Sequence, residues 1–89
     1  MFSRFSTLFM LALSLTAAAP LKIVLVGDST VNDEGGWGTG FRAAMGPEVE
    51  VVNLAANGRS SKSFRDEGRW QPALEQKPRY IIIQFGHND

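Results

Sequence analysis

A short apolar segment that ends in a polar turn constrains the fold of this chain more than any other feature. Residues Ile23 to Val26 are all aliphatic, and Gly-Asp-Ser-Thr follows directly at 27–30. A strand that is apolar on both faces is typical of a parallel sheet covered by helices on both sides. Open α/β sheets place their reacting groups at the carboxyl ends of the strands. The segment therefore predicts a buried strand, 22–26, with Ser29 just beyond its carboxyl end.

The same arrangement occurs twice more along the chain. Residues 49–52 are predicted as a second, short strand, with valine at three of its four positions, and a polar loop with Asn57 and Gly58 follows it. Residues 80–85 are the clearest strand, and Gly-His-Asn-Asp follows at 86–89. Because parallel strands end at one edge of a sheet, the three polar loops are expected to form one site.

Helical segments alternate with these strands. Residues 37–45 have the spacing of a short amphipathic helix that Gly46 and Pro47 end. Residues 60–70 are polar and fit one irregular helix, and residues 72–74 open a helical turn that Pro78 stops. The order β-α-β-α-β predicts the α/β class, with a parallel sheet and right-handed crossovers.

Composition excludes several classes of function. The 89 residues include no cysteine, so the chain has no disulfide and no thiolate metal site. Nine acidic and nine basic residues are interspersed, which gives no support for nucleic acid as a partner. The glycine-rich segment 36–41 has Phe41 where a dinucleotide fingerprint needs glycine, and segment 27–30 lacks the lysine of a P-loop. The nucleophile elbow Gly-x-Ser-x-Gly is absent as well.

The first residues have the order of a secretory leader. Arg4 precedes the apolar run 8–15, and the small residues 16–19 follow it. The run is too short to span a bilayer, and a buried N-terminal helix is disfavoured because the run is apolar all round and lacks caps. The sequence predicts a signal peptide over residues 1–18, with cleavage after Ala18, and a secreted protein that has no membrane contact afterwards.

The chemistry that fits the three loops is acyl transfer. Ser29 offers a hydroxyl and its own N–H at a strand end. A developing oxyanion needs two or three hydrogen-bond donors that converge on one point. Gly58, which has no Cβ, offers a backbone N–H that can approach closely, and Asn88 offers a neutral side-chain NH₂. The prediction is a Ser29 nucleophile with Gly58 and Asn88 in the oxyanion hole, and no metal or organic cofactor is required.

These blocks resemble a known family. Gly27-Asp28-Ser29, Gly58 after Asn57, and Gly86-His87-Asn88-Asp89 resemble the first three signature blocks of the GDSL/SGNH hydrolase superfamily. Among its members the chain is most similar to rhamnogalacturonan acetylesterases, through the segments 36–38, 57–64, 67–70 and 84–89.

The resemblance implies a flavodoxin-like three-layer α/β/α fold, of which about the first three strands lie within residues 19–89. It implies the same roles for Ser29, Gly58 and Asn88, a monomer when full-length, and deacetylation of a pectic polysaccharide, rhamnogalacturonan. The family's general base is a histidine in an Asp-x-x-His block near the C-terminus, and this chain ends before it. We therefore expect a truncated N-terminal part of the hydrolase domain that is inactive by itself.

Competing interpretations exist for several site residues. Ser29 can instead cap the following helix. His87, the only histidine, is expected to be structural or to contact substrate rather than to act as the base. A metal site formed by His87, Asp28 and Asp89 is disfavoured because no ligand spacing is diagnostic. The two carboxylates are instead expected to brace their loops by accepting backbone hydrogen bonds.

The remaining candidates concern substrate binding. Arg59 belongs to a basic run that is either a solvated face or a contact for an anionic polysaccharide; the run also contains Lys62, Arg65 and Arg69. Trp37 is a core or cleft-wall residue in preference to a sugar-stacking platform. The prediction is a secreted carbohydrate esterase. The alternatives are a lipase- or thioesterase-like member of the superfamily and a non-catalytic carbohydrate-binding remnant.

Overall fold

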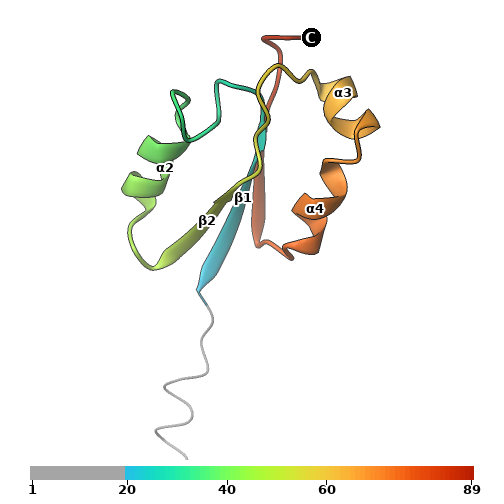
Figure 1. The fold of residues 1–89 in the computed structure, drawn as a ribbon. Helices are drawn as coiled ribbons and strands as arrows, with labels where there is room; N and C mark the ends of the chain where they lie inside the picture. The colour runs from blue at the N-terminus through green and yellow to red at the C-terminus, as the bar shows by residue number, and fades with distance from the viewer. Residues whose placement is uncertain (1–19) are drawn as a thin grey trace, which may run out of the picture.

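The computed structural model describes residues 20–89 (Figure 1). The predicted signal peptide lies outside the described residues. Within residues 20–89 the elements are β1 (Leu21–Gly27), α2 (Gly38–Met45), β2 (Val49–Asn53), α3 (Ser61–Asp66), α4 (Trp70–Glu75) and β3 (Tyr80–Gln84). In this part of the chain no helix has the length and apolar character needed to cross a membrane.

The three strands form a parallel sheet in the order β2-β1-β3. Leu21 pairs with Val49 on one side of β1, and Ile23 pairs with Tyr80 on the other. β1 is the central strand, and Val24, Leu25 and Val26 in it are fully buried. The expectation of a parallel sheet with a doubly covered first strand is confirmed.

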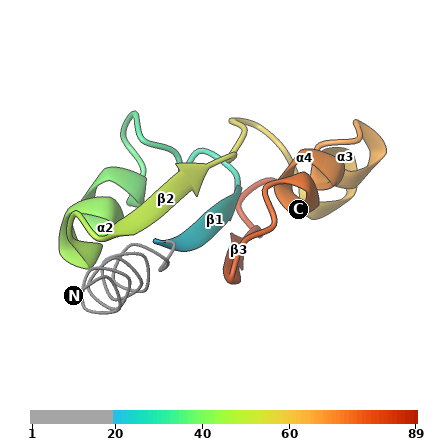
Figure 2. The ribbon, with the colours of Figure 1, turned by 90° about the horizontal axis from the view of Figure 1, so that it is seen from below.

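Helices cover both faces of the sheet and make three layers (Figures 1 and 2). Successive β1 side chains point to opposite faces, as the pleat of a strand requires. Ile23 and Leu25 pack on the α2 side, in a core cluster with Val31 and Val51. Val24 and Val26 pack on the other side, in a cluster with Phe64 of α3 and Ala73 of α4. The chain thus has the α/β architecture of a partial flavodoxin-like fold.

The helical region after β2 differs from the expectation of one irregular helix over 60–70. Gly68 adopts a left-handed φ of 75°, which ends the first helical segment and redirects the chain. Trp70 therefore belongs to α4, whose first turn also accommodates Pro72. α3 begins at a capping box, in which the Ser60 hydroxyl accepts a hydrogen bond from Ser63 N, and Ser60 N donates to Ser63 Oγ.

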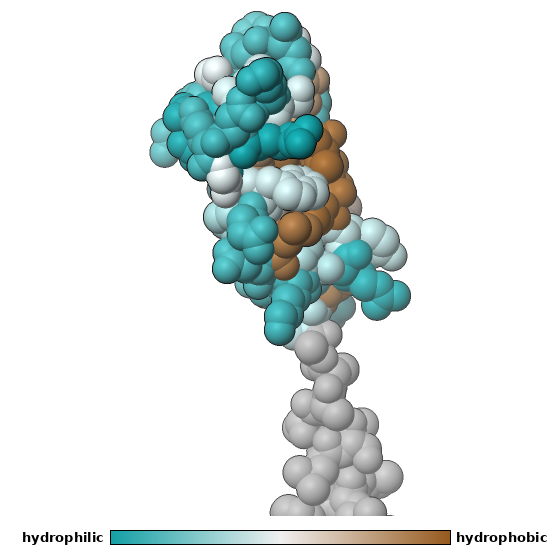
Figure 3. Space-filling model, turned by 90° about the vertical axis from the view of Figure 1, so that its right-hand side faces the viewer, coloured by the Kyte–Doolittle hydropathy of each residue, from teal (hydrophilic) through white to brown (hydrophobic). Residues whose placement is uncertain are grey.

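An apolar surface lies along β3. Among the described strands β3 pairs with β1 alone, and its Tyr80 and Ile83 are 55% and 53% exposed. Figure 3 shows hydrophobic residues gathered on this side of the molecule, with hydrophilic residues around them. A hollow of about 220 Å³ opens there, lined by Val26, Ser61, Phe64, Arg65, Trp70, Ile83 and Phe85.

Candidate functional site

The loops that follow the three strands meet at one edge of the sheet. The Asn32 side-chain amide, in the loop after β1, donates a hydrogen bond to Asn57 Oδ1, in the loop after β2. Asn88, in the loop after β3, donates from Nδ2 to the Arg59 carbonyl oxygen over 3.1 Å. Asp89 accepts hydrogen bonds from Ser61 N at 2.9 Å and from Ser61 Oγ at 2.6 Å. The predicted meeting of the three polar loops is confirmed.

A buried carboxylate shapes the turn that carries Ser29. Asp28 is 1% exposed, and its Oδ1 accepts hydrogen bonds from Thr30 Oγ1 at 2.6 Å and from Thr30 N at 2.9 Å. The expected bracing role of Asp28 and Asp89 is confirmed by these contacts and by the Ser61 contacts. Within residues 20–89 the other carboxylate oxygen of Asp28, Oδ2, is buried without a hydrogen-bond partner.

These contacts keep Asp28 ionised. The hydrogen bond from the Thr30 hydroxyl lowers the pKa of Asp28 below its usual value, and burial opposes this by raising it. The Thr30 N–H and the electrostatic interaction with His87 lower the pKa further. The carboxylate next to Ser29 therefore carries its negative charge at neutral pH.

Ser29 lies at the turn itself and is partly exposed. The interpretation of Ser29 as a helix cap is wrong, because α2 begins only at Gly38 and Trp37 occupies its N-cap position. Within the described part of the chain, the Ser29 hydroxyl has no hydrogen-bond partner, and His87 makes no hydrogen bond to it. The hydroxyl is thus left available at the carboxyl end of the central strand.

The glycine at the second loop is required by backbone conformation rather than by crowding. Gly58 has a φ of 76°, in the left-handed region, and a Cβ there would meet nothing within 4 Å. Gly58 is exposed at the surface of this loop. The close approach of its N–H to an oxyanion stays a prediction.

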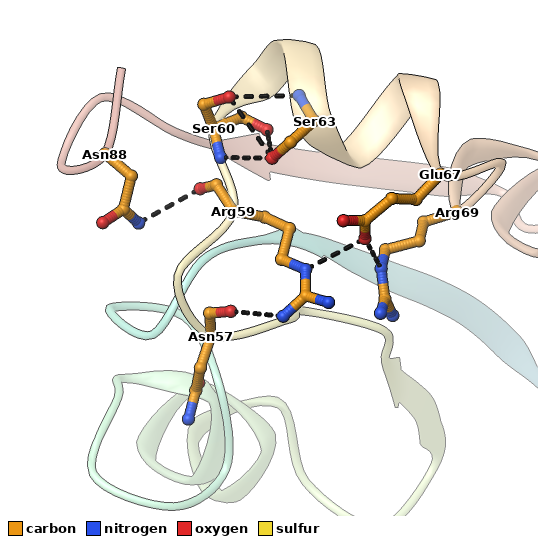
Figure 4. A network of polar contacts seen from close by, with 7 residues as sticks. All are labelled: Asn57, Arg59, Ser60, Ser63, Glu67, Arg69 and Asn88. Carbon is orange, nitrogen blue, oxygen red and sulfur yellow. Dashed lines mark hydrogen bonds and ion pairs between the residues drawn. The ribbon is translucent and has the colours of Figure 1, made fainter.

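Figure 4 shows a charged network around Arg59, the residue that follows this glycine in the sequence. Glu67 Oε1 accepts hydrogen bonds from Arg59 Nε at 3.0 Å and from Arg69 Nε at 2.6 Å. These two hydrogen bonds, the one from Arg69 first, hold the pKa of Glu67 below its usual value. Arg59 also donates from Nη1 to the Asn57 carbonyl oxygen over 2.8 Å. Two of the donor nitrogens of Arg59 are thus engaged within the chain.

Trp37 connects the first and third loops from the α2 side. Its ring packs edge-on against Phe41 with 5.7 Å between ring centroids, and it lies against the core cluster of that face. Its Nε1 donates to Gln84 Oε1, at the end of β3, over 2.6 Å. Trp37 therefore packs against the core, the first of the two roles expected for it.

Several residues of the site were missed by sequence reasoning. Asn32, Glu67 and Gln84 each have a partner from another segment, so no local pattern marks them. A polar cleft of about 350 Å³ lies between the first two loops, lined by Asn32, Asp33, Glu34, Asn53, Ala55 and Asn57. Among the described residues no group of three His, Cys, Asp or Glu side chains could hold a metal ion.

Comparisons with known proteins add a relationship to this geometry. No protein-family model matches the chain, and no solved structure matches it. The chain is 42% identical over 79 residues to rhamnogalacturonan acetylesterase RhgT of Bacillus subtilis, which covers 79% of this chain. It is 40% identical over 75 residues, 75% of the chain, to a protein of the same bacterium named probable rhamnogalacturonan acetylesterase YesY. It is also 40% identical over 78 residues, 84% of the chain, to a rhamnogalacturonan acetylesterase of Emericella nidulans.

These matches cover 35%, 34% and 31% of YesY, RhgT and the Emericella protein, so the chain spans about a third of each relative's length. They confirm the relationship to rhamnogalacturonan acetylesterases that the sequence blocks predict.

Proposed function

We propose that this chain supplies the nucleophile and the oxyanion-binding loops of a serine esterase that removes acetyl groups from rhamnogalacturonan. The observation that carries the proposal is the similarity to three proteins with that name, which extends over 75% to 84% of this chain. The partly exposed position of Ser29 and the hydrogen bonds between the loops support it.

The proposed reaction proceeds through an acyl-enzyme. Ser29 Oγ attacks the acetyl carbonyl carbon while a general base removes the hydroxyl proton. The N–H groups of Ser29 and Gly58 and the Asn88 side chain stabilise the negative oxygen of the tetrahedral intermediate. The sugar leaves as an alcohol after it receives the proton, and water then releases acetate and restores Ser29. As the family resemblance implies, the base would be a histidine of an Asp-x-x-His block in the complete protein.

The setting of this reaction follows from the leader and the chemistry. A signal peptide over residues 1–18 would deliver the protein to the exterior, where plant polysaccharide is accessible. The partner is then the polysaccharide substrate. Acyl transfer by serine requires no cofactor, and a monomer suffices for it.

The test uses the complete protein, of which this chain would form about a third. Acetate release from acetylated rhamnogalacturonan is measured for the wild type, Ser29→Ala and Thr39→Ala. Loss of the nucleophile is expected to lower the rate by about 10⁴- to 10⁶-fold. Thr39 is an exposed residue on α2 whose hydroxyl, within residues 20–89, donates a hydrogen bond to the Asp33 carbonyl oxygen, so its loss is expected to leave the rate unchanged.

Mass spectrometry of the enzyme quenched during turnover provides the second readout. We expect an acetyl adduct on the peptide that contains Ser29, and none in Ser29→Ala. Full activity of Ser29→Ala, or an adduct on a different residue, would contradict the proposal.

The 89-residue chain alone gives a separate prediction. Without a base to remove the hydroxyl proton, its turnover of p-nitrophenyl acetate is expected to stay close to that of the Ser29→Ala chain. A rate comparable to that of complete acetylesterases would show that residues 1–89 contain the base, and would make His87 its candidate.

A further inference from the structure

We propose that Arg59 is a positioning residue that fixes the direction of two oxyanion donors, the Gly58 N–H and the Asn88 side chain. This role rests on the function proposed above. It differs from the expected role of Arg59 as a contact for an anionic polysaccharide.

The first part of the argument concerns a single peptide group. The Asn57 carbonyl and the Gly58 N–H belong to the same planar trans peptide, so they point in opposite directions and rotate together. Arg59 Nη1 donates to the Asn57 carbonyl oxygen over 2.8 Å (Figure 4). That hydrogen bond therefore also fixes the direction of the Gly58 N–H.

Apart from this bond, the turn that contains the peptide is closed by a hydrogen bond from Arg59 N to the Ala56 carbonyl oxygen, which is long at 3.4 Å. Glycine has access to more of φ/ψ space than any other residue, and beyond its two chain neighbours no atom lies within 4 Å of the position of a Cβ at residue 58. A peptide next to such a residue rotates easily unless a hydrogen bond restrains it. A cationic donor also polarises the peptide, which strengthens the N–H as a donor at the opposite end.

The second part concerns Asn88. An asparagine amide has two N–H donors, and Asn88 Nδ2 uses one of them on the Arg59 carbonyl oxygen at 3.1 Å. Because the amide is planar, this contact sets the direction of the remaining N–H. Arg59 thus acts on Asn88 through its backbone and on Gly58 through its side chain.

The guanidinium is itself held in place by Glu67. Arg59 Nε lies 3.0 Å from Glu67 Oε1, and Arg69 Nε lies 2.6 Å from the same oxygen. The Arg59 side chain is 32% exposed, and its charge is paired within the chain. A planar fork that bonds a carboxylate on one side and a carbonyl on the other suits arginine, and lysine cannot reproduce it.

The experiment compares Arg59→Ala, Arg59→Lys and Glu67→Ala in the complete protein. Asp66→Asn is the matched control, since Asp66 is an exposed carboxylate next to Glu67, at the end of α3, and within residues 20–89 its ion pair is with Lys62. The steady-state constants kcat and KM are measured on p-nitrophenyl acetate, a small neutral ester, and on acetylated rhamnogalacturonan. The neutral ester separates positioning from attraction of an anionic polymer.

We expect Arg59→Ala to lower kcat by about 10- to 100-fold on both substrates, with KM changed less than twofold. Arg59→Lys keeps the charge but not the fork, so it is expected to restore little of this loss. Glu67→Ala is also expected to lower kcat. Asp66→Asn is expected to leave kcat and KM unchanged. If Arg59→Ala instead raises KM on the polysaccharide and spares the neutral ester, Arg59 contacts substrate and the inference is overturned.

A measurement independent of activity separates this inference from the proposed function. Backbone ¹⁵N relaxation is expected to show a lower order parameter for the Gly58 amide in Arg59→Ala, below about 0.6, and an unchanged one in Asp66→Asn. If the wild type releases no acetate, the function fails, and the relaxation result still tests whether Arg59 holds the peptide. An unchanged order parameter in Arg59→Ala would overturn the positioning role.

Discussion

At the scale of single residues, some charged side chains have hydrogen-bond partners that are close in the sequence, and others have partners that are distant in it. Asp28 is two residues from Thr30, which it braces, so an aspartate after a strand predicts its own hydrogen bonds. Arg59 is eight residues from Glu67, and nothing in the sequence between them indicates the contact. The bracing of Asp28 could be predicted from sequence, whereas the partners of Arg59 required the structure.

Asp28 has a consequence for acid stability. Because folding lowers its pKa, the ionised carboxylate stabilises the fold above about pH 3.8, the unfolded value, and this contribution is lost as the pH falls through the lower folded pKa. At neutral pH, the wild type is therefore expected to have a higher melting temperature than Asp28→Asn. The difference should shrink as the pH is lowered from 4 towards 2. Thermal unfolding of both proteins from pH 2 to pH 7 measures it, and a difference that does not change with pH would contradict this account.

Asn88 is the other residue whose role can be isolated. Asn88→Ala removes one proposed oxyanion donor, and kcat is expected to fall by about 10²- to 10³-fold with little change in KM, because that hydrogen bond strengthens in the transition state. Gln71→Ala removes an exposed amide from α4 and serves as the control. Equal kcat values for the two variants would show that Asn88 does not contribute to the oxyanion hole.

At the scale of elements, the strands and α2 could be predicted closely, and the region between β2 and β3 could not. Aliphatic runs mark β1 and β3 within a residue or two of their observed ends, and Gly46 marks the end of α2. Residues 60–70 are polar and lack a hydrophobic period, so their division at Gly68 depends on how Phe64 and Trp70 pack against the sheet. The left-handed conformation of Gly68 and this packing together set the helix boundary there.

The capping box of α3 offers a stability test at this scale. Ser60→Ala removes the hydroxyl that accepts the Ser63 N–H, and is expected to cost about 1 kcal/mol of unfolding free energy. Chemical denaturation measures the loss. Lys62→Ala is the control, because Lys62 is an exposed residue of the same helix whose ion pair with Asp66 contributes little. Equal midpoints for the two variants would contradict the capping role.

At the scale of the whole molecule, the exposed side of β3 is the least protected surface of the described chain. An apolar strand edge with free backbone groups favours pairing with another chain. The 89-residue chain alone is therefore expected to associate with itself. Ile83→Lys should reduce the association and Met45→Lys, on the opposite side of the sheet, should not. Light scattering across a concentration series distinguishes them, and a monomeric wild-type chain would contradict the prediction.

The central position of β1 also sets an order of events during folding. β1 pairs with β2 after a short excursion through α2, and with β3 only after a much longer one through α3 and α4. Shorter loops close at a lower entropic cost, so the β1–β2 unit is expected to form first and to bring the Ser29 and Gly58 turns together early. Asn88 follows β3 and arrives with the latest pairing. A nascent chain would thus carry an assembled serine turn well before it could stabilise an oxyanion.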